Sequence, residues 1–160
     1  IMLSLEGVPA FYIHSLFGTR NDYALYKQTN QNRSLNRGKI KISEIDLSNE
    51  SEPKSYIFLQ LKKLMLIRKK QPAFHPNAVQ FTLHLGSNLY GIWRQSLDKK
   101  QSIFCISNLT DEAVNLSLLD LNLIGFDHWR DIITEIEIDD ISSEIELRPY
   151  QTIWLTNLQK

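Results

Sequence analysis

The chain has 160 residues, of which 42% are hydrophobic and 22% charged, as in ordinary folded proteins with one core or two small ones. Its 18 lysines and arginines equal its 18 aspartates and glutamates, so zero net charge offers no long-range attraction to nucleic acid or to an anionic membrane. One cysteine allows no internal disulfide, and no apolar run approaches the ~20 residues that span a bilayer, so we expect a cytoplasmic protein.

The first predicted element is a strand at residues 8–14. The chain opens with IMLSL, without an initiator methionine or a polar leader, which indicates a fragment that starts within a structural element. Residues 8–14 (VPAFYIH) then form a short, nearly continuous apolar run. Such a run predicts a strand buried on both faces, as in a parallel sheet. Because that strand needs neighbours that the chain does not contain, this region is not expected to fold alone.

A polar stretch, residues 18–50, follows the predicted strand. Its first half is dense in Asn and Gln and nearly free of large aliphatic side chains. A loop of this length is usually functional or disordered. The segment 29–37 (TNQNRSLNR) contains Arg33 and Arg37, and the rigid donor fork of arginine suits carboxylates, phosphates and vicinal hydroxyls. On chemistry alone, a solvated loop with surface arginines is the simpler interpretation.

Residues 51–71 carry the pattern of a helix. Ser51 is a candidate N-cap, Pro53 suits the first turn, and Pro72 ends the pattern. The residues that recur at the spacing of one helical face are Ile57, Leu61, Leu64, Met65 and Arg68. The basic residues 68–70 complement the negative end of the helix dipole, and we interpret them as a solvated helix end rather than as an anion site.

From residue 77 onward the hydrophobic period changes to that of strands. Apolar and polar residues alternate at 79–85, 114–118, 136–138 and 145–147, and further strands are expected at 89–95, 101–107 and 152–155. The run 101–107 is apolar on both faces, which predicts a central strand with Cys105 as a small buried hydrophobe. Short strands at this spacing predict an all-β antiparallel domain, a sheet or a sandwich, that folds by itself.

No pattern typical of catalysis or metal binding occurs in the sequence. The four histidines are scattered, and none forms the i, i+4 pair that places two ligands on one helix face, so no metal site is expected. Nucleophile elbows and phosphate-cradling glycine loops are missing too. The acidic residues of 135–146 alternate with isoleucines, which predicts a solvated strand face rather than a pair of catalytic carboxylates. We therefore assign no catalytic residue.

Tryptophans on the predicted β domain offer one alternative function. Flat rings stack on sugar faces, and Trp93, Trp129 and Trp154 are the candidates. Trp154 lies between Ile153 and Leu155 and is expected in the core, whereas Trp129 lies near a turn and is the surface candidate. An accessory carbohydrate-binding or structural β domain without catalytic activity is therefore one hypothesis, and an assembly role within a larger protein is another.

Motifs spread over nearly the whole chain carry a family resemblance. They are GVPAFY at 7–12, QPAFHPN at 71–77, FTLH at 81–84 and YQTIWL at 150–155, with Gly18, Asn21-Asp22, Lys27, Thr29-Asn30 and Arg33-x-x-Asn36-Arg37. Together they resemble the sucrose phosphorylases of the α-amylase superfamily. The resemblance is closer to the branch that acts on sucrose 6-phosphate, glucosylglycerol or glucosylglycerate.

The resemblance implies an architecture. Residues 1–76 would be the C-terminal end of a (β/α)₈ catalytic barrel, with strand 8–14, polar loop 18–50 and helix 51–71, and residues 77–160 would be its all-β C-terminal domain. The polar loop would then follow the carboxyl end of a barrel strand, where barrel enzymes place their active sites. In related phosphorylases the position matched by Arg33 lies beside the bound glucosyl unit, and Arg37 would orient the loop or help to bind an anion.

The reaction implied for the intact parent is retaining transfer of a glucosyl unit from sucrose or a related α-glucoside to phosphate, a co-substrate, without another cofactor. The catalytic carboxyl groups would belong to earlier barrel strands, so the fragment alone is expected to be inactive. The acceptor (fructose, its phosphate, glycerol or glycerate) stays open. Exposed barrel surfaces would favour self-association. A barrel remnant predicts residues 8–14 without lateral strand partners, whereas a free-standing β domain would bury this run in its own core.

Overall fold

The chain divides into two compact units in a computed structural model, which describes residues 1–121, 128–140 and 142–158. The β unit comprises Ile1–Pro9 and Ile67–Lys160, and the loop unit comprises Ala10–Leu66. The observed division differs from the boundary predicted between residues 76 and 77. The first nine residues and the end of the long helix pack with the strands, through contacts that no local sequence pattern reveals.

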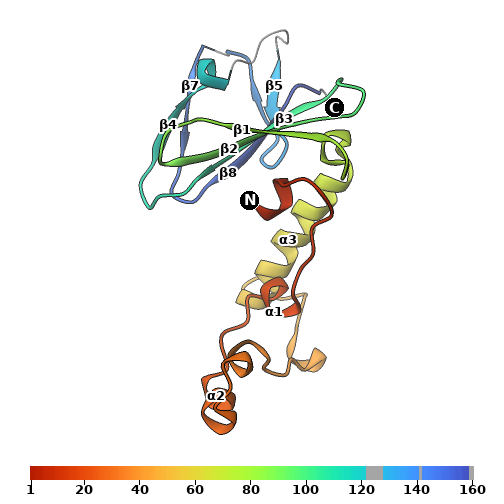
Figure 1. Ribbon diagram of the computed structural model, residues 1–160, viewed down its shortest axis with the longest axis vertical. Helices are drawn as coiled ribbons and strands as arrows, with labels where there is room; N and C mark the ends of the chain where they lie inside the picture. The colour runs from red at the N-terminus through yellow and green to blue at the C-terminus, as the bar shows by residue number, and fades with distance from the viewer. Residues whose placement is uncertain (122–127, 141, 159–160) are drawn as a thin grey trace. The chain divides into compact units, whose positions relative to one another are not determined.

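The β unit contains two antiparallel sheets (Figure 1). The larger sheet has the order β1-β2-β3-β8-β5-β6, and the smaller one pairs β4 with β7. The strands are β1 (Val79–Leu83), β2 (Leu89–Gln95), β3 (Ser102–Asn108), β4 (Val114–Ser117), β5 (Trp129–Asp131), β6 (Ile136–Ile138), β7 (Glu144–Leu147) and β8 (Thr152–Thr156). They confirm the predicted all-β antiparallel domain. Only β5 was not predicted, because its sequence WRD has a single apolar residue and therefore shows no alternation.

The hydrophobic core of the β unit lies between the two sheets. Phe104 and Ile106 of β3 pack in one cluster with Leu116 of β4 and Leu147 of β7, each at most 5% exposed. Every residue of β3 is buried, so both faces of this strand are covered, as its apolar run predicts.

The second face of the large sheet is covered by residues that precede it in the chain. Phe74, in the 3-10 turn η4 (Pro72–Phe74), meets Trp154 of β8 edge to face, with ring centroids 4.8 Å apart. Trp154 pairs in register with Cys105 of β3. Cys105 is buried, which confirms the prediction, and this burial raises the pKa of its thiol.

Arg94 of β2 holds the start of the chain against the sheet. Its side chain is completely buried, and its guanidinium donates to the carbonyl oxygens of Ser4 at 3.1 Å, His75 at 3.1 Å and Ala78 at 3.4 Å. Burial lowers the pKa of Arg94. Through carbonyl dipoles rather than a carboxylate, this buried arginine joins two segments, the start of the chain and the turn at residues 75–78, to β2.

Arg68 makes the same kind of contact from the end of the long helix. It donates to the carbonyl oxygens of Leu3, Leu5 at 3.3 Å and Gly7 at 3.0 Å. Only 7% of Arg68 is exposed, so the prediction of a solvated helix end at residues 68–70 is wrong for this residue and correct for the two lysines after it. The physical reason is that its acceptors lie more than sixty residues away in the sequence.

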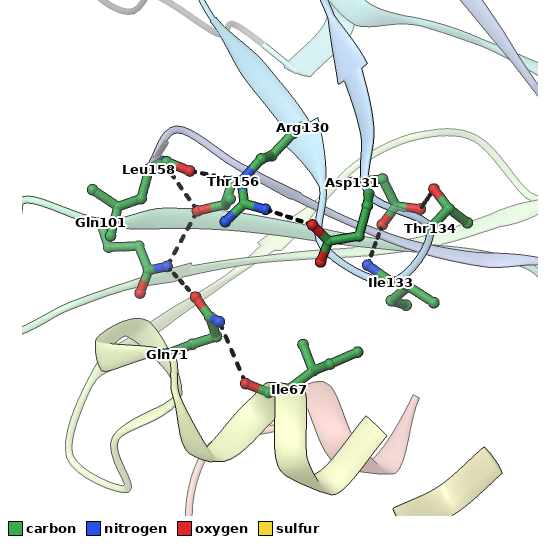
Figure 2. A network of polar contacts seen from close by, with 10 residues as sticks. Ile67, Gln71, Gln101, Arg130, Asp131, Ile133, Thr134, Thr156 and Leu158 are labelled. Carbon is green, nitrogen blue, oxygen red and sulfur yellow. Dashed lines mark hydrogen bonds and ion pairs between the residues drawn. The ribbon is translucent and has the colours of Figure 1, made fainter. Parts of the chain in front are cut away.

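Glutamines tie the end of this helix to the sheet, as Figure 2 shows. Gln101 donates to the Gln71 side chain at 2.6 Å and to the Thr156 hydroxyl at 3.2 Å, and Gln71 donates to the Ile67 carbonyl at 3.4 Å. Gln101 is 1% exposed, so these contacts replace the water that the buried amide would otherwise bind.

The loop unit is helical and irregular. Its elements are α1 (Ile13–Leu16), α2 (Tyr23–Thr29), η2 (Asn32–Asn36), η3 (Ile42–Glu44) and most of α3 (Pro53–Lys69). The predicted helix 51–71 is confirmed to within two residues at each end, and the predicted polar loop 18–50 contains short helices. Within the described ranges, no helix is long and apolar enough to cross a membrane.

The predicted strand at residues 8–14 does not form. Residues 8–12 carry no strand pairing, residues 13–14 begin α1, and Val8 is 80% exposed. Tyr12 keeps extended backbone angles (φ −74°, ψ 139°). A strand needs ladder partners for its backbone groups, and none of the described segments supplies them. Lateral isolation of this run is the outcome expected of a barrel remnant.

Candidate functional site

The polar segment 19–37 folds back on itself within the loop unit. The Asp22 carboxylate caps α2 by accepting from the Leu25 amide at 2.8 Å, and the Asp22 amide donates to the Leu35 carbonyl at 2.6 Å. Asn30 ends α2 in the left-handed conformation (φ 49°), and its amide donates to the Tyr26 carbonyl at 2.7 Å. Asp and Asn supply this local order without burying apolar surface.

Side-chain hydrogen bonds hold η2 beside α2. The hydroxyls of Thr29 and Ser34 lie 2.7 Å apart, and Ser34 is only 7% exposed. The Tyr12 hydroxyl donates to the Asn36 carbonyl at 2.7 Å. The polar segment is therefore anchored to Tyr12, in the unpaired run that precedes α1.

Both predicted sugar-binding arginines are exposed on this segment. The Arg33 side chain donates through Nε to the Gln31 amide oxygen at 2.8 Å, which leaves its terminal nitrogens pointing to no described acceptor. Within the part of the chain that the structure describes, the Arg37 side chain forms no hydrogen bond, and its amide donates to the Ser34 carbonyl at 3.3 Å. Among the described residues, neither guanidinium forms an ion pair. Their donors are therefore available to a ligand.

A hollow of about 670 Å³ opens in the same unit. Its polar lining includes His14, Thr19, Arg20, Asp22, Lys39 and Lys54. Neither of the two predicted arginines lines it. The sequence did not suggest this site, because its cations lie fifteen or more residues apart and share no motif.

Tight turns shape the wall of the hollow. The His14 Nδ1 lies 2.7 Å from the Thr19 hydroxyl, and the Thr19 amide donates to the His14 carbonyl at 2.9 Å. Gly18 between them has φ 55°, and a Cβ at this position would collide with the side chain of Ile57 in α3. A side chain at this position would strain the left-handed backbone and displace Ile57, so glycine is favoured here.

The carboxylates beside the hollow serve as helix caps. Asp22 caps α2, and Glu52 accepts from the Ser55 amide at 2.9 Å and the Ser55 hydroxyl at 3.1 Å at the start of α3. The predicted N-cap, Ser51, is therefore replaced in this role by Glu52. No described group of three or more His, Cys, Asp or Glu could hold a metal ion. The arrangement suits binding of a polar ligand rather than cleavage of one.

The tryptophans do not form a surface platform for sugar. Trp129, the predicted surface candidate, is 2% exposed, so that prediction is wrong, and Trp154 is buried to the same degree, as predicted. Trp93 is half-buried and stacks on Phe104 with ring centroids 5.7 Å apart. The core takes these rings because they fill the space on both faces of β3.

Some known proteins resemble this chain in sequence along nearly its whole length. It matches no protein-family model. It is 34% identical over 158 residues to a glucosylglycerate phosphorylase of Escherichia coli (97% of this chain, 26% of that protein). It is 32% identical over 157 residues to one of Allomeiothermus silvanus (97% and 25%). The chain thus spans about a quarter of the length of these relatives.

Solved structures show the same fold. The cyclic alpha-maltosyl-(1→6)-maltose hydrolase of Arthrobacter globiformis matches 98% of this chain and 28% of its own, with TM-score 0.66 and 18% identity. The trehalose-6-phosphate hydrolase of Bacillus licheniformis matches 96% and 36%, with TM-score 0.63 and 18% identity. The resemblance drawn from the motifs is thereby confirmed: along nearly its whole length this chain is similar in sequence to part of the glucosylglycerate phosphorylases, and it shares its fold with part of the two hydrolases.

Proposed function

We propose that these residues belong to a phosphorylase that transfers a glucosyl unit from an α-glucoside to inorganic phosphate. The observation that carries this proposal is 34% identity along 97% of the chain to a glucosylglycerate phosphorylase. Because the relatives reported above share that name, glucosylglycerate is a better candidate donor than sucrose.

In the proposed reaction the bond between the anomeric carbon and the aglycone oxygen breaks, and a bond to a phosphate oxygen forms. A carboxylate first attacks the anomeric carbon while a carboxylic acid protonates the departing oxygen, and phosphate then displaces the carboxylate with overall retention. The product is glucose 1-phosphate. Phosphate is a co-substrate, and the proposal needs no other cofactor.

The two carboxyl groups are supplied by other parts of the parent. The carboxylates near the hollow, Asp22 and Glu52, are engaged as helix caps, and the acidic residues of 135–146 belong to the β unit. Removal of the nucleophile and the acid costs far more rate than binding contacts can restore. We therefore expect the 160-residue chain alone to be inactive.

Arg33 is the proposed sugar contact of this chain, with Arg37 in support. Exposed guanidinium groups without an ion pair, on a segment that tight turns hold in place, are suited to vicinal hydroxyls. Glucose presents such hydroxyl pairs. Sequence similarity to sugar phosphorylases across the same segment supports this assignment.

The test measures glucose 1-phosphate release by the parent enzyme from glucosylglycerate and sucrose. Arg33→Ala should lower kcat/KM at least tenfold, because one lost charged hydrogen bond costs about 1.5–3 kcal/mol. Arg148→Ala, which removes an exposed arginine of the β unit, is the matched control and should change kcat/KM less than twofold. Absence of phosphorolysis with every α-glucoside would overturn the proposed function, and unchanged turnover in Arg33→Ala would overturn only the role of that residue.

A further inference from the structure

We propose that the hollow in the loop unit is a binding site for a small oxyanion, either inorganic phosphate or the carboxylate of an acidic sugar derivative. Its link to catalysis rests on the proposed function, but anion binding itself is a property of this chain. The ligand class follows from the number of positive and negative side chains in the lining and from the hydrogen bonds that its carboxylates make.

Three cations from three segments line the hollow. Arg20 precedes α2, Lys39 follows η2, and Lys54 lies in the first turn of α3. None of them forms an ion pair with a carboxylate that the structure describes. Lys54 is half-buried, and Arg20 and Lys39 are exposed. Cationic side chains that converge from separate segments create a positive potential that attracts an anion.

The two carboxylates of the lining are already committed. Asp22 accepts from the Leu25 amide at 2.8 Å, and Glu52 accepts from the Ser55 amide and hydroxyl at 2.9 and 3.1 Å. Each of them compensates the first turn of its own helix. Both carboxylates keep their charge, so the three cations of the lining exceed them by one, and a bound oxyanion would balance this excess.

The size of the hollow decides which form of the anion it admits. The Thr19 hydroxyl on its wall is already within hydrogen-bond distance of the His14 ring, at 2.7 Å, and of the His14 carbonyl, at 3.4 Å. A volume of about 670 Å³ exceeds what a phosphate ion needs, so the anion can arrive attached to a sugar or with its water. Lysine and arginine together bind both phosphate and carboxylate, because each provides charge-assisted donors.

The experiment titrates the ¹⁵N-labelled chain with inorganic phosphate at constant ionic strength and follows the amide shifts of residues 19–24 and 39–40. Glycerate and uncharged glucose are the parallel arms. We expect saturable shifts with phosphate, glycerate or both, and none with glucose. Lys39→Gln and Lys54→Gln should each weaken binding about three- to tenfold, as expected for the loss of one partly screened charge contact.

Lys27→Gln is the matched control, since Lys27 is an exposed lysine of α2 outside the lining. It should change affinity less than twofold. The amide resonances of α3 at residues 57–66 report in each variant whether the loop unit is folded. Equal weakening by Lys27→Gln, or no saturable shift with either anion, would overturn the inference. If the chain binds phosphate but its parent releases no glucose 1-phosphate, the proposed function is wrong and the anion site is still supported.

Discussion

The β unit and the loop unit are stabilised in different ways. All buried hydrophobic side chains of the described ranges lie in the β unit, whereas the only buried side chains found in the loop unit are those of Ser34 and Ser55. Large apolar residues are exposed in both units, and those of the loop unit are Tyr12, Ile13, Tyr23, Ile42, Leu47, Tyr56 and Leu66. Ile42 reaches 88% exposure.

The two units show that a defined backbone conformation does not by itself make a unit stable. Caps, Asn and Gly turns and side-chain hydrogen bonds give the loop unit defined backbone conformations, but each contributes about 1 kcal/mol or less. Burial of apolar surface is the dominant favourable term in folding, and it is concentrated in the β unit. The loop unit therefore depends on surfaces beyond itself. A catalytic barrel would supply them in the proposed parent, and self-association is the alternative we propose for the isolated chain.

The largest expected effect comes from Arg94, which joins residues 1–9 to the sheet. Arg94→Ala should lower the free energy of unfolding of the β unit by about 4 kcal/mol. The substitution leaves a cavity, and it leaves the carbonyls of Ser4, His75 and Ala78 without their hydrogen-bond donor. Urea denaturation followed by tryptophan fluorescence measures it. Arg94→Met keeps most of the volume, so its smaller loss isolates the hydrogen-bond contribution. A loss below 1 kcal/mol in Arg94→Ala would show that this contact does not hold the β unit together.

A smaller effect is expected from Asp22, which caps α2 in the loop unit. Asp22→Ala should cost about 1 kcal/mol of local helix stability through loss of the bond to the Leu25 amide, and Asp22→Asn should retain most of it. The denaturation midpoint of the β unit should not move. Amide shifts of residues 23–29 report the local change, and a lowered midpoint for the β unit would mean that the two units unfold together.

The sequence was sufficient where a pattern is local. Residues 89–95 and the two-faced run of β3 became strands as predicted, and the spacing of Ile57, Leu61 and Leu64 predicted α3. It failed where partners are remote. The apolar run 8–14 has the composition of a strand but no ladder partner, and the contact of Arg68 with Gly7 joins residues sixty-one positions apart.

The candidate site shows the same limit. Arg33 and Arg37 were found from a motif, and the structure leaves both exposed, so their role stays a prediction for the parent. The hollow was missed because Arg20, Lys39 and Lys54 converge only after the segment folds back between Asp22 and Leu35. Single residues that come together from separate turns leave no periodic pattern in the sequence.

Native-state hydrogen exchange on the 160-residue chain tests the difference between the units most directly. Amides of β2, β3 and β8 should exchange only by global unfolding, and those of α2 and of α3 up to residue 66 should exchange at least ~100-fold faster, through local opening. Equal protection of the two sets of amides would contradict the account, because it would show that the loop unit shares the stability of the β unit without a core of its own.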